Sequence, residues 1–269
     1  MDKQDIKEEI IKKSIEEFIL NFRHPKKKFY LLNCEPSKDW LGIYEALYQS
    51  YFREPNQEWI FKNISKNEKL NSETISEMDA FIITGSSQST YDDNLSWLPY
   101  LFDLIKKVYL SEKGKILGIC FGHQALGRGL GGLSEKMKLI EDKPYLLHKN
   151  KLTFTSNIRT KNFYNKSRSF NYEEKIFLHQ SHGDHVSQIP EKAEILAFSD
   201  DTKVEMFCLE EKILGLQSHP EFCDLMMNYR LIHIKKGDEK WKEFCRRSFE
   251  VDRVDNWEIV QMCRDFLTG

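Results

Sequence analysis

An apolar run that ends in a glycine-flanked cysteine lies near the middle of the chain: Lys115-Ile116-Leu117-Gly118-Ile119-Cys120-Phe121-Gly122-His123. The residues before Cys120 have the length and composition of a buried strand, and residues 124–130 can form the helix that follows. Glycines on both sides of the cysteine suit a sharp strand-to-helix turn in which the two elements approach too closely for Cβ atoms. This pattern is typical of a nucleophile elbow, with cysteine where hydrolases of another fold carry serine.

The start of a helix also favours a thiolate, because peptide dipoles and free N–H groups point at the sulfur. A buried structural cysteine between two packing glycines is the alternative interpretation of the same residues.

Apolar segments around this run predict a parallel sheet. Residues 28–33 form the expected first central strand, and Ala80-Phe81-Ile82-Ile83 runs into the glycine-containing turn Thr84-Gly85-Ser86-Ser87. Residues 97–110 carry helix-spaced leucines between that strand and the one ending at Cys120, a strand–helix–strand unit whose crossover favours parallel pairing. Shorter strand-like pieces at 151–155, 175–178, 195–199, 204–209 and 213–217 predict a mixed extension of the sheet.

Both ends of the chain have helical patterns. Residues 5–22 place isoleucines and phenylalanines at three- and four-residue intervals, and this helix is expected to end before His24-Pro25. We therefore predict an amphipathic helical extension at 1–27 and one domain at 28–269. Its C-terminal helices are expected to bury six side chains: Trp241, Phe244, Cys245, Trp257, Val260 and Phe266.

Composition excludes several classes of function. Forty basic residues against 42 acidic ones give a net charge of −2, so the overall field attracts neither nucleic acid nor an anionic membrane. The first residues have no apolar core of signal-peptide length and no run reaches membrane-spanning length, which predicts a soluble, cytoplasmic protein. Six well-separated cysteines are expected to be free thiols, and no paired histidine spacing indicates a metal site.

A thiolate nucleophile needs a base, and the base needs a group that orients it. The best candidates are His219 and Glu221, in Gln217-Ser218-His219-Pro220-Glu221 directly after the apolar run 213–216. A strand end there can present the imidazole to the cleft that contains Cys120.

The two motifs together resemble the signatures of class I glutamine amidotransferases, in which cysteine attacks a side-chain amide, histidine moves the proton and glutamate orients histidine. The resemblance implies these roles for Cys120, His219 and Glu221, and a flavodoxin-like three-layer α/β fold. It also implies an oxyanion hole from Phe121 and the turn Gly85-Ser86. A His-Gly-Asp-like turn, His182-Gly183-Asp184, and Gln124 resemble the family's substrate-binding positions.

Within the family, the nearest resemblances are to plant-type γ-glutamyl peptidases and to the amidotransferase domain of GMP synthase. They imply a cysteine hydrolase that cleaves glutamine or a γ-glutamyl peptide, such as a glutathione conjugate, without a metal or organic cofactor. Two alternatives stay open: a glutaminase subunit that supplies ammonia to a separate synthase, and a catalytically silent binding module. The leaving group and the oligomeric state are not fixed by the sequence.

Overall fold

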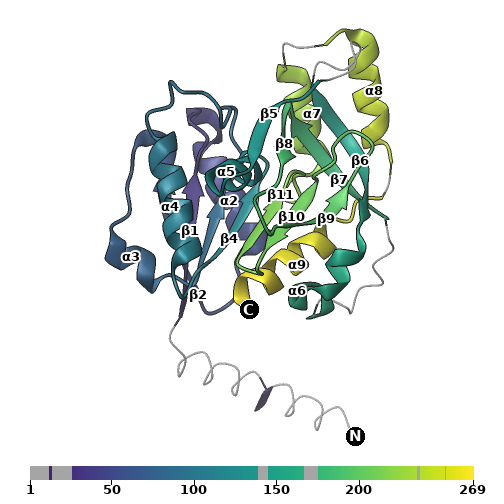
Figure 1. Ribbon diagram of the computed structural model, residues 1–269. Helices are drawn as coiled ribbons and strands as arrows, with labels where there is room; N and C mark the ends of the chain where they lie inside the picture. The colour runs from purple at the N-terminus through teal and green to yellow at the C-terminus, as the bar shows by residue number, and fades with distance from the viewer. Residues whose placement is uncertain (1–11, 14–25, 139–144, 167–174, 235–236, 252) are drawn as a thin grey trace, which may run out of the picture.

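A nine-stranded sheet forms the centre of the computed structural model (Figure 1). The structure describes residues 12–13, 26–138, 145–166, 175–234, 237–251 and 253–269. Most of the predicted N-terminal extension therefore lies outside the described residues, apart from Lys12 and Lys13, which are helical and exposed. In the described ranges, no helix is both long and apolar enough to cross a membrane.

The strand order in the sheet is β2-β1-β3-β4-β11-β10-β9-β6-β7. The first five of these strands pair in parallel, and the remaining pairs are antiparallel. The strands are β1 Lys27–Asn33, β2 Gln57–Asn63, β3 Ala80–Ile83, β4 Lys115–Ile119, β6 Leu146–Phe154, β7 Lys175–His182, β9 Glu194–Phe198, β10 Met206–Leu209 and β11 Ile213–Leu216. A separate antiparallel pair consists of β5 Leu133–Lys136 and β8 Asp184–Gln188.

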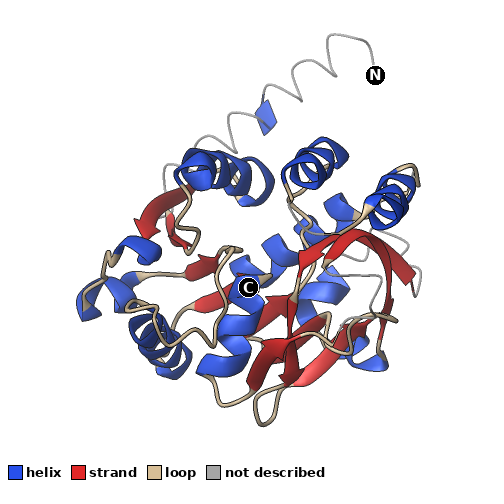
Figure 2. Ribbon diagram, turned by 90° about the horizontal axis from the view of Figure 1, so that it is seen from above, coloured by secondary structure: helices blue, strands red, loops and turns tan. Residues whose placement is uncertain are grey.

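Helices lie on both sides of the sheet (Figure 2). They are α2 Lys38–Phe52, α3 Ser72–Glu77, α4 Leu98–Leu110, α5 Phe121–Gly129, α6 Asn162–Lys166, α7 Asp224–His233, α8 Glu239–Phe249 and α9 Asn256–Thr268. Alternate residues of the central strands face opposite layers, as strand geometry requires. Phe29 and Leu31 pack with α2 and α9, whereas Tyr30 and Leu32 pack with α3 and α4. The predicted three-layer α/β fold is confirmed.

Several predicted boundaries differ from the structure. The strand β2 and the helix α2 were not predicted, and α5 begins at Phe121, earlier than the expected 124. Two of the six residues expected to be buried at the C-terminus are exposed, Phe244 at 42% and Trp257 at 51%. Trp257 packs under the Arg264 guanidinium, 4.9 Å from its ring centroid, instead of entering the core.

Two glycines allow β4, α5 and β3 to meet. A Cβ atom added to Gly118 would lie 2.5 Å from the backbone of Gly122, and one added to Gly122 would lie 2.3 Å from the carbonyl oxygen of Ile83. Both distances are far below van der Waals contact, and the atoms that would be hit belong to the backbone. The glycines that flank Cys120 are therefore required by packing, as the sequence predicted.

We expect Gly122→Ala to lower the free energy of unfolding by about 2 kcal/mol or more, because α5 must move away from β3 to admit the methyl group. Gly42→Ala is the matched control, since Gly42 lies in α2 and an added Cβ there has no neighbour within 4 Å. It should be neutral or stabilising by up to about 1 kcal/mol. Urea unfolding measures both, and an unchanged Gly122→Ala midpoint would contradict the packing argument.

Candidate active site

Cys120 occupies the turn between β4 and α5, at the carboxyl end of a central strand. Its backbone has φ +53° and ψ −104°, a positive φ that residues with a side chain adopt rarely and often at functional sites. The Cys120 amide donates to the Leu216 carbonyl at 2.8 Å, and the Gln124 amide donates to the Cys120 carbonyl at 3.1 Å. The predicted strand–turn–helix geometry is confirmed, and it holds the sulfur at the edge of the sheet.

His219 reaches the same edge from the neighbouring strand. β11 pairs in parallel with β4, with Leu216 opposite Ile119. The segments that follow the two strands therefore leave the sheet at the same end. A Cβ atom added at Gly85 would lie 3.1 Å from His219 Cε1 and 3.7 Å from Cys120 Cβ. The imidazole and the cysteine therefore border the same small space above Gly85.

A buried carboxylate orients the imidazole. His219 Nδ1 donates to Glu221 Oε1 at 2.8 Å, and the Tyr48 hydroxyl from α2 donates to the same oxygen at 3.2 Å. Glu221 is fully buried. The ring of His219 stacks on Phe222, with centroids 4.1 Å apart and planes 8° from parallel. His219 Nε2 has no hydrogen-bond partner among the described residues, so this nitrogen can exchange a proton with the cysteine or with a substrate.

Electrostatics favour a protonated imidazole in this setting. Burial alone would lower the pKa of His219, but the Glu221 carboxylate and the Cys120 sulfur raise it to about 9. An imidazolium between a carboxylate and a thiolate is the charge state that cysteine nucleophiles use. The arrangement can hold a nucleophilic sulfur and supply a proton to a leaving group.

A pocket of about 120 Å³ opens beside Cys120. Its walls include all four residues predicted to bind substrate, Gln124, His182, Gly183 and Asp184, together with Ser86 of the predicted oxyanion hole. The Asp184 carboxylate accepts hydrogen bonds from Ser89 Oγ at 2.6 Å and from the Tyr91 hydroxyl at 2.8 Å. The amide side chain of Gln124 donates to the Asp184 carbonyl at 3.0 Å. The pocket is small compared with the roughly 300–1,000 Å³ of sites for drug-sized ligands, and its size suits one amino-acid-sized group.

The backbone donors predicted for an oxyanion hole differ in their partners. The Phe121 amide is the first of α5 and has no intrahelical acceptor. The Gly85 amide donates to the Tyr48 hydroxyl at 3.3 Å, and the Ser86 hydroxyl donates to the Cys34 carbonyl at 2.8 Å. Phe121 therefore offers the most directly available N–H group at the nucleophile, while Gly85 and Ser86 hold the facing loop in place.

The nucleophile, the imidazole and the carboxylate that orients it lie in a segment that matches a known protein family. The model of the class I glutamine amidotransferase family matches residues 44–235, most of the chain, including Cys120, His219 and Glu221. The chain belongs to this family.

Several known proteins are similar to the chain over different lengths. Gamma-glutamyl peptidase 4 of Arabidopsis thaliana is 27% identical over 252 residues, covering 90% of this chain and 96% of the relative. A glutamine-hydrolyzing GMP synthase subunit of Methanococcus vannielii is 32% identical over 142 residues, covering 52% of this chain and 64% of the relative. The crystal structure of a glutamine amidotransferase from Thermotoga maritima superposes with a TM-score of 0.65 at 20% identity, covering 92% of this chain and all of that one.

The predicted binding residue His182 faces inward in this amidotransferase fold. Its Nδ1 lies 2.9 Å from the Asp184 carbonyl oxygen and its Nε2 lies 3.0 Å from Gln180 Oε1. Burial lowers the pKa of His182 to about 3, so the ring is neutral at pH 7. Its contacts brace the turn that carries Gly183 and Asp184, although the residue also lines the pocket.

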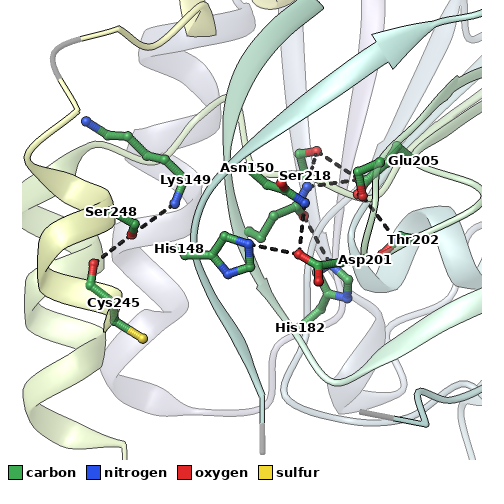
Figure 3. A network of polar contacts seen from close by, with 12 residues as sticks. His148, Lys149, Asn150, His182, Asp201, Thr202, Glu205, Ser218, Cys245 and Ser248 are labelled. Carbon is green, nitrogen blue, oxygen red and sulfur yellow. Dashed lines mark hydrogen bonds and ion pairs between the residues drawn. The ribbon is translucent and has the colours of Figure 1, made fainter. Parts of the chain in front are cut away.

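Behind His182, Gln180 connects the pocket to a buried carboxyl group that the sequence did not reveal. Gln180 Nε2 donates to Glu205 Oε2 at 2.9 Å and to Ser218 Oγ at 3.0 Å, and Ser199 Oγ donates to Glu205 Oε1 at 2.6 Å. Figure 3 shows Glu205, Ser218 and His182 in one connected set of polar contacts. Ser218 precedes the histidine of the candidate site, so this network supports both the pocket and the His219 strand end.

The number of protons available for hydrogen bonding couples His182, Gln180 and Glu205. A neutral imidazole has one N–H, yet both nitrogens of His182 face carbonyl oxygens. Rotating the Gln180 amide would give the second nitrogen a donor, and Gln180 Oε1 would then need a proton from Glu205. Burial raises the pKa of Glu205 to about 7, so the carboxyl can provide that proton at and below neutral pH.

Three contributors to the site were not predicted from the sequence. Tyr48 bonds Glu221, Glu205 anchors the network, and Phe222 stacks on His219. The spacing of Tyr44, Tyr48 and Phe52 at four-residue intervals could have indicated an aromatic helix face, but no residue pattern marks which strand that face covers.

The pKa of His219 should fall when the carboxylate is removed. In the Glu221→Gln variant the imidazolium loses its strongest favourable neighbour while the burial that lowers its pKa stays, so we expect titration well below the value of about 9 in the parent protein. NMR of histidine ring resonances, assigned with a His219→Gln variant, measures this shift. Unchanged titration in Glu221→Gln would contradict the role of the carboxylate.

Glu205→Gln should remove the loss of folding stability that the ionisation of Glu205 causes as pH rises. Because the folded-state pKa of about 7 is above the model value of 4.5, the stability contributed by protonated Glu205 is present below pH 4.5 and is lost as pH rises through 7. Glutamine mimics the protonated carboxyl, so its advantage over glutamate should grow from pH 5 to pH 8, by up to about 3 kcal/mol. Urea unfolding across this range tests it, with the exposed Glu191→Gln as the control. A pH-independent difference would disprove the protonated state.

Proposed function

We propose that the chain is a cysteine hydrolase that cleaves γ-glutamyl amide bonds through a thioester on Cys120. The observation that carries this proposal is the convergence of Cys120, His219 and Glu221, with the Nδ1–Oε1 bond of 2.8 Å between the last two. The likeness to γ-glutamyl peptidase 4 across 90% of the chain supports a γ-glutamyl substrate.

The mechanism follows from the positions of these groups. The Cys120 thiolate attacks the γ-carbonyl carbon, and the oxyanion receives a hydrogen bond from the Phe121 amide. His219 Nε2 then gives its proton to the departing nitrogen, the C–N bond breaks, and a γ-glutamyl thioester remains. Water attacks the thioester, its proton passes to His219, and glutamate leaves as the Cys120 sulfur is regenerated.

Within the pocket, one γ-glutamyl group has polar partners at both ends. The Asp184 carboxylate lies in the pocket wall, which supports its pairing with the α-ammonium group of the substrate, and Gln124 and the 86–89 loop line the same pocket. The reaction so described requires no step from a metal or an organic cofactor.

A second candidate is a glutaminase subunit that delivers ammonia to a separate synthase. The likeness to the GMP synthase subunit of Methanococcus vannielii over 52% of the chain favours it. The chemistry at Cys120 would be the same, but glutamine would be the substrate and turnover would depend on the synthase.

Cys120→Ala should abolish glutamate release, because no other described group at the site can form the thioester, while leaving the thermal unfolding midpoint nearly unchanged. Glutamine, glutathione and a γ-glutamyl dipeptide should be offered in parallel, with glutamate as the measured product. Release from glutathione or the dipeptide supports the stand-alone hydrolase, and release from glutamine only when a synthase is added supports the second candidate. Equal rates for parent and Cys120→Ala would refute both.

A further inference from the structure

Arg230, in the last turn of α7, carries a charge without a carboxylate partner among the described residues. Its guanidinium carbon lies 5.5 Å from the ring centroids of both Trp40 and Phe222. Its Nη2 reaches the Tyr145 hydroxyl only at 3.5 Å, the limit of a hydrogen bond. Asp224, the acidic residue of the same helix, forms its contacts with His179 and Lys149 and not with Arg230. A half-buried cation whose described partners are two aromatic rings and one long hydrogen bond to a hydroxyl can accept a carboxylate as a further partner.

The guanidinium lies against two walls of the candidate active site. On one side, the Tyr145 hydroxyl is 3.3 Å from Ser181 Oγ, and the Ser181 carbonyl faces Cys120 Sγ at 3.9 Å. On the other side, Arg230 lies over the ring of Phe222, and the same ring stacks on His219. Burial alone would lower the pKa of Arg230, but Tyr145, Tyr44 and Cys120 raise it, so its charge acts on the site.

The position of the leaving group follows from the pocket and the imidazole. The pocket beside Cys120 has about 120 Å³ and room for one amino-acid-sized group, which the γ-glutamyl moiety fills. The departing nitrogen must face His219 to receive a proton, so whatever is attached to it extends out of the pocket past Tyr145, which lines the pocket and whose hydroxyl lies 3.5 Å from Arg230 Nη2. Arg230 lies on that side, and ammonia offers it nothing to bind.

We propose that Arg230 binds the carboxylate of a peptidic leaving group, which makes γ-glutamyl peptides with a free terminal carboxylate, and not glutamine, the favoured substrates. The planar guanidinium suits two parallel N–H···O bonds to a carboxylate. Trp40 and Phe222 hold the plane of the group in place beforehand, which reduces the entropy lost on binding. This inference rests on the proposed function, because it names the second product of that same reaction.

The test compares three substrates that share the γ-glutamyl group: a γ-glutamyl dipeptide, the same dipeptide with its terminal carboxylate amidated, and glutamine. The parent protein should prefer the free acid over the amide. Arg230→Gln should lower kcat/KM for the acid by roughly ten- to hundredfold, the range expected for a charge-assisted hydrogen bond. It should change kcat/KM for the amide and for glutamine by less than about threefold, and Arg230→Lys should restore part of the loss.

Arg247→Gln serves as the control for loss of a positive charge, since Arg247 is 74% exposed on α8 and pairs with Glu243. It should leave all three substrates unaffected, and circular dichroism should show that every variant is folded. Equal losses for acid, amide and glutamine in Arg230→Gln would overturn the proposal, because Arg230 would then serve the γ-glutamyl group itself. A parent protein that prefers glutamine over the free acid would overturn it as well.

Calorimetry with Cys120→Ala separates this inference from the proposed function. The free-acid dipeptide should bind at least about tenfold more tightly than its amide, and adding Arg230→Gln should remove the difference. If that discrimination is seen but the parent protein releases no glutamate from any substrate, the hydrolase proposal fails while the carboxylate site stands. If turnover occurs and neither kinetics nor binding distinguishes acid from amide, the carboxylate site fails alone.

Discussion

The parallel pairing of β4 with β11 is the constraint on which the site depends. It sets Leu216 opposite Ile119 and ends both strands at one edge of the sheet, so that residues far apart in the sequence emerge side by side. The close contact of α5 with β3, made possible by Gly122, then fixes the direction in which Cys120 leaves its strand. A shift of either strand by one residue would direct the side chains at the strand ends to the opposite face. The geometry of the candidate site is therefore a consequence of sheet register as much as of the residues themselves.

Two buried carboxyl groups lie close to this edge, and the protein stabilises them in opposite ways. Glu221 Oε1 accepts from His219, whose pKa the carboxylate raises, and from the Tyr48 hydroxyl, whereas Glu221 Oε2 has no hydrogen-bond partner among the described residues. Glu205 has only neutral donors, and burial raises its pKa instead. The contrast explains why one carboxylate can polarise the imidazole while the other acts as a structural anchor behind the pocket.

The sequence was sufficient to predict the parts of the site that depend on short stretches of neighbouring residues. Gly118 and Gly122 predict the elbow because only residues without a Cβ atom allow the backbones to approach this closely. The strand before His219 predicts that the imidazole lies near Cys120. The sequence did not predict α2 as the source of Tyr48, nor the position of Arg230, because both depend on which helix covers which part of the sheet. Residue order alone also did not show that His182 would turn both ring nitrogens toward the protein.

A negative and a positive side chain lie on different sides of the candidate site. Asp184 lies in the pocket wall and Arg230 lies beyond Tyr145, on the side of the imidazole. A γ-glutamyl peptide carries an α-ammonium and an α-carboxylate group at its glutamyl end, a second carboxylate at its other end, and the reactive amide between them. In the proposed orientation the ammonium group faces Asp184 and the terminal carboxylate faces Arg230. Glutamine matches the ammonium end alone. In the proposed mode, attraction at both ends would position the amide over Cys120, and binding energy from the leaving group would orient the carbonyl for attack. Substrate choice and catalysis would then arise from the same two charges.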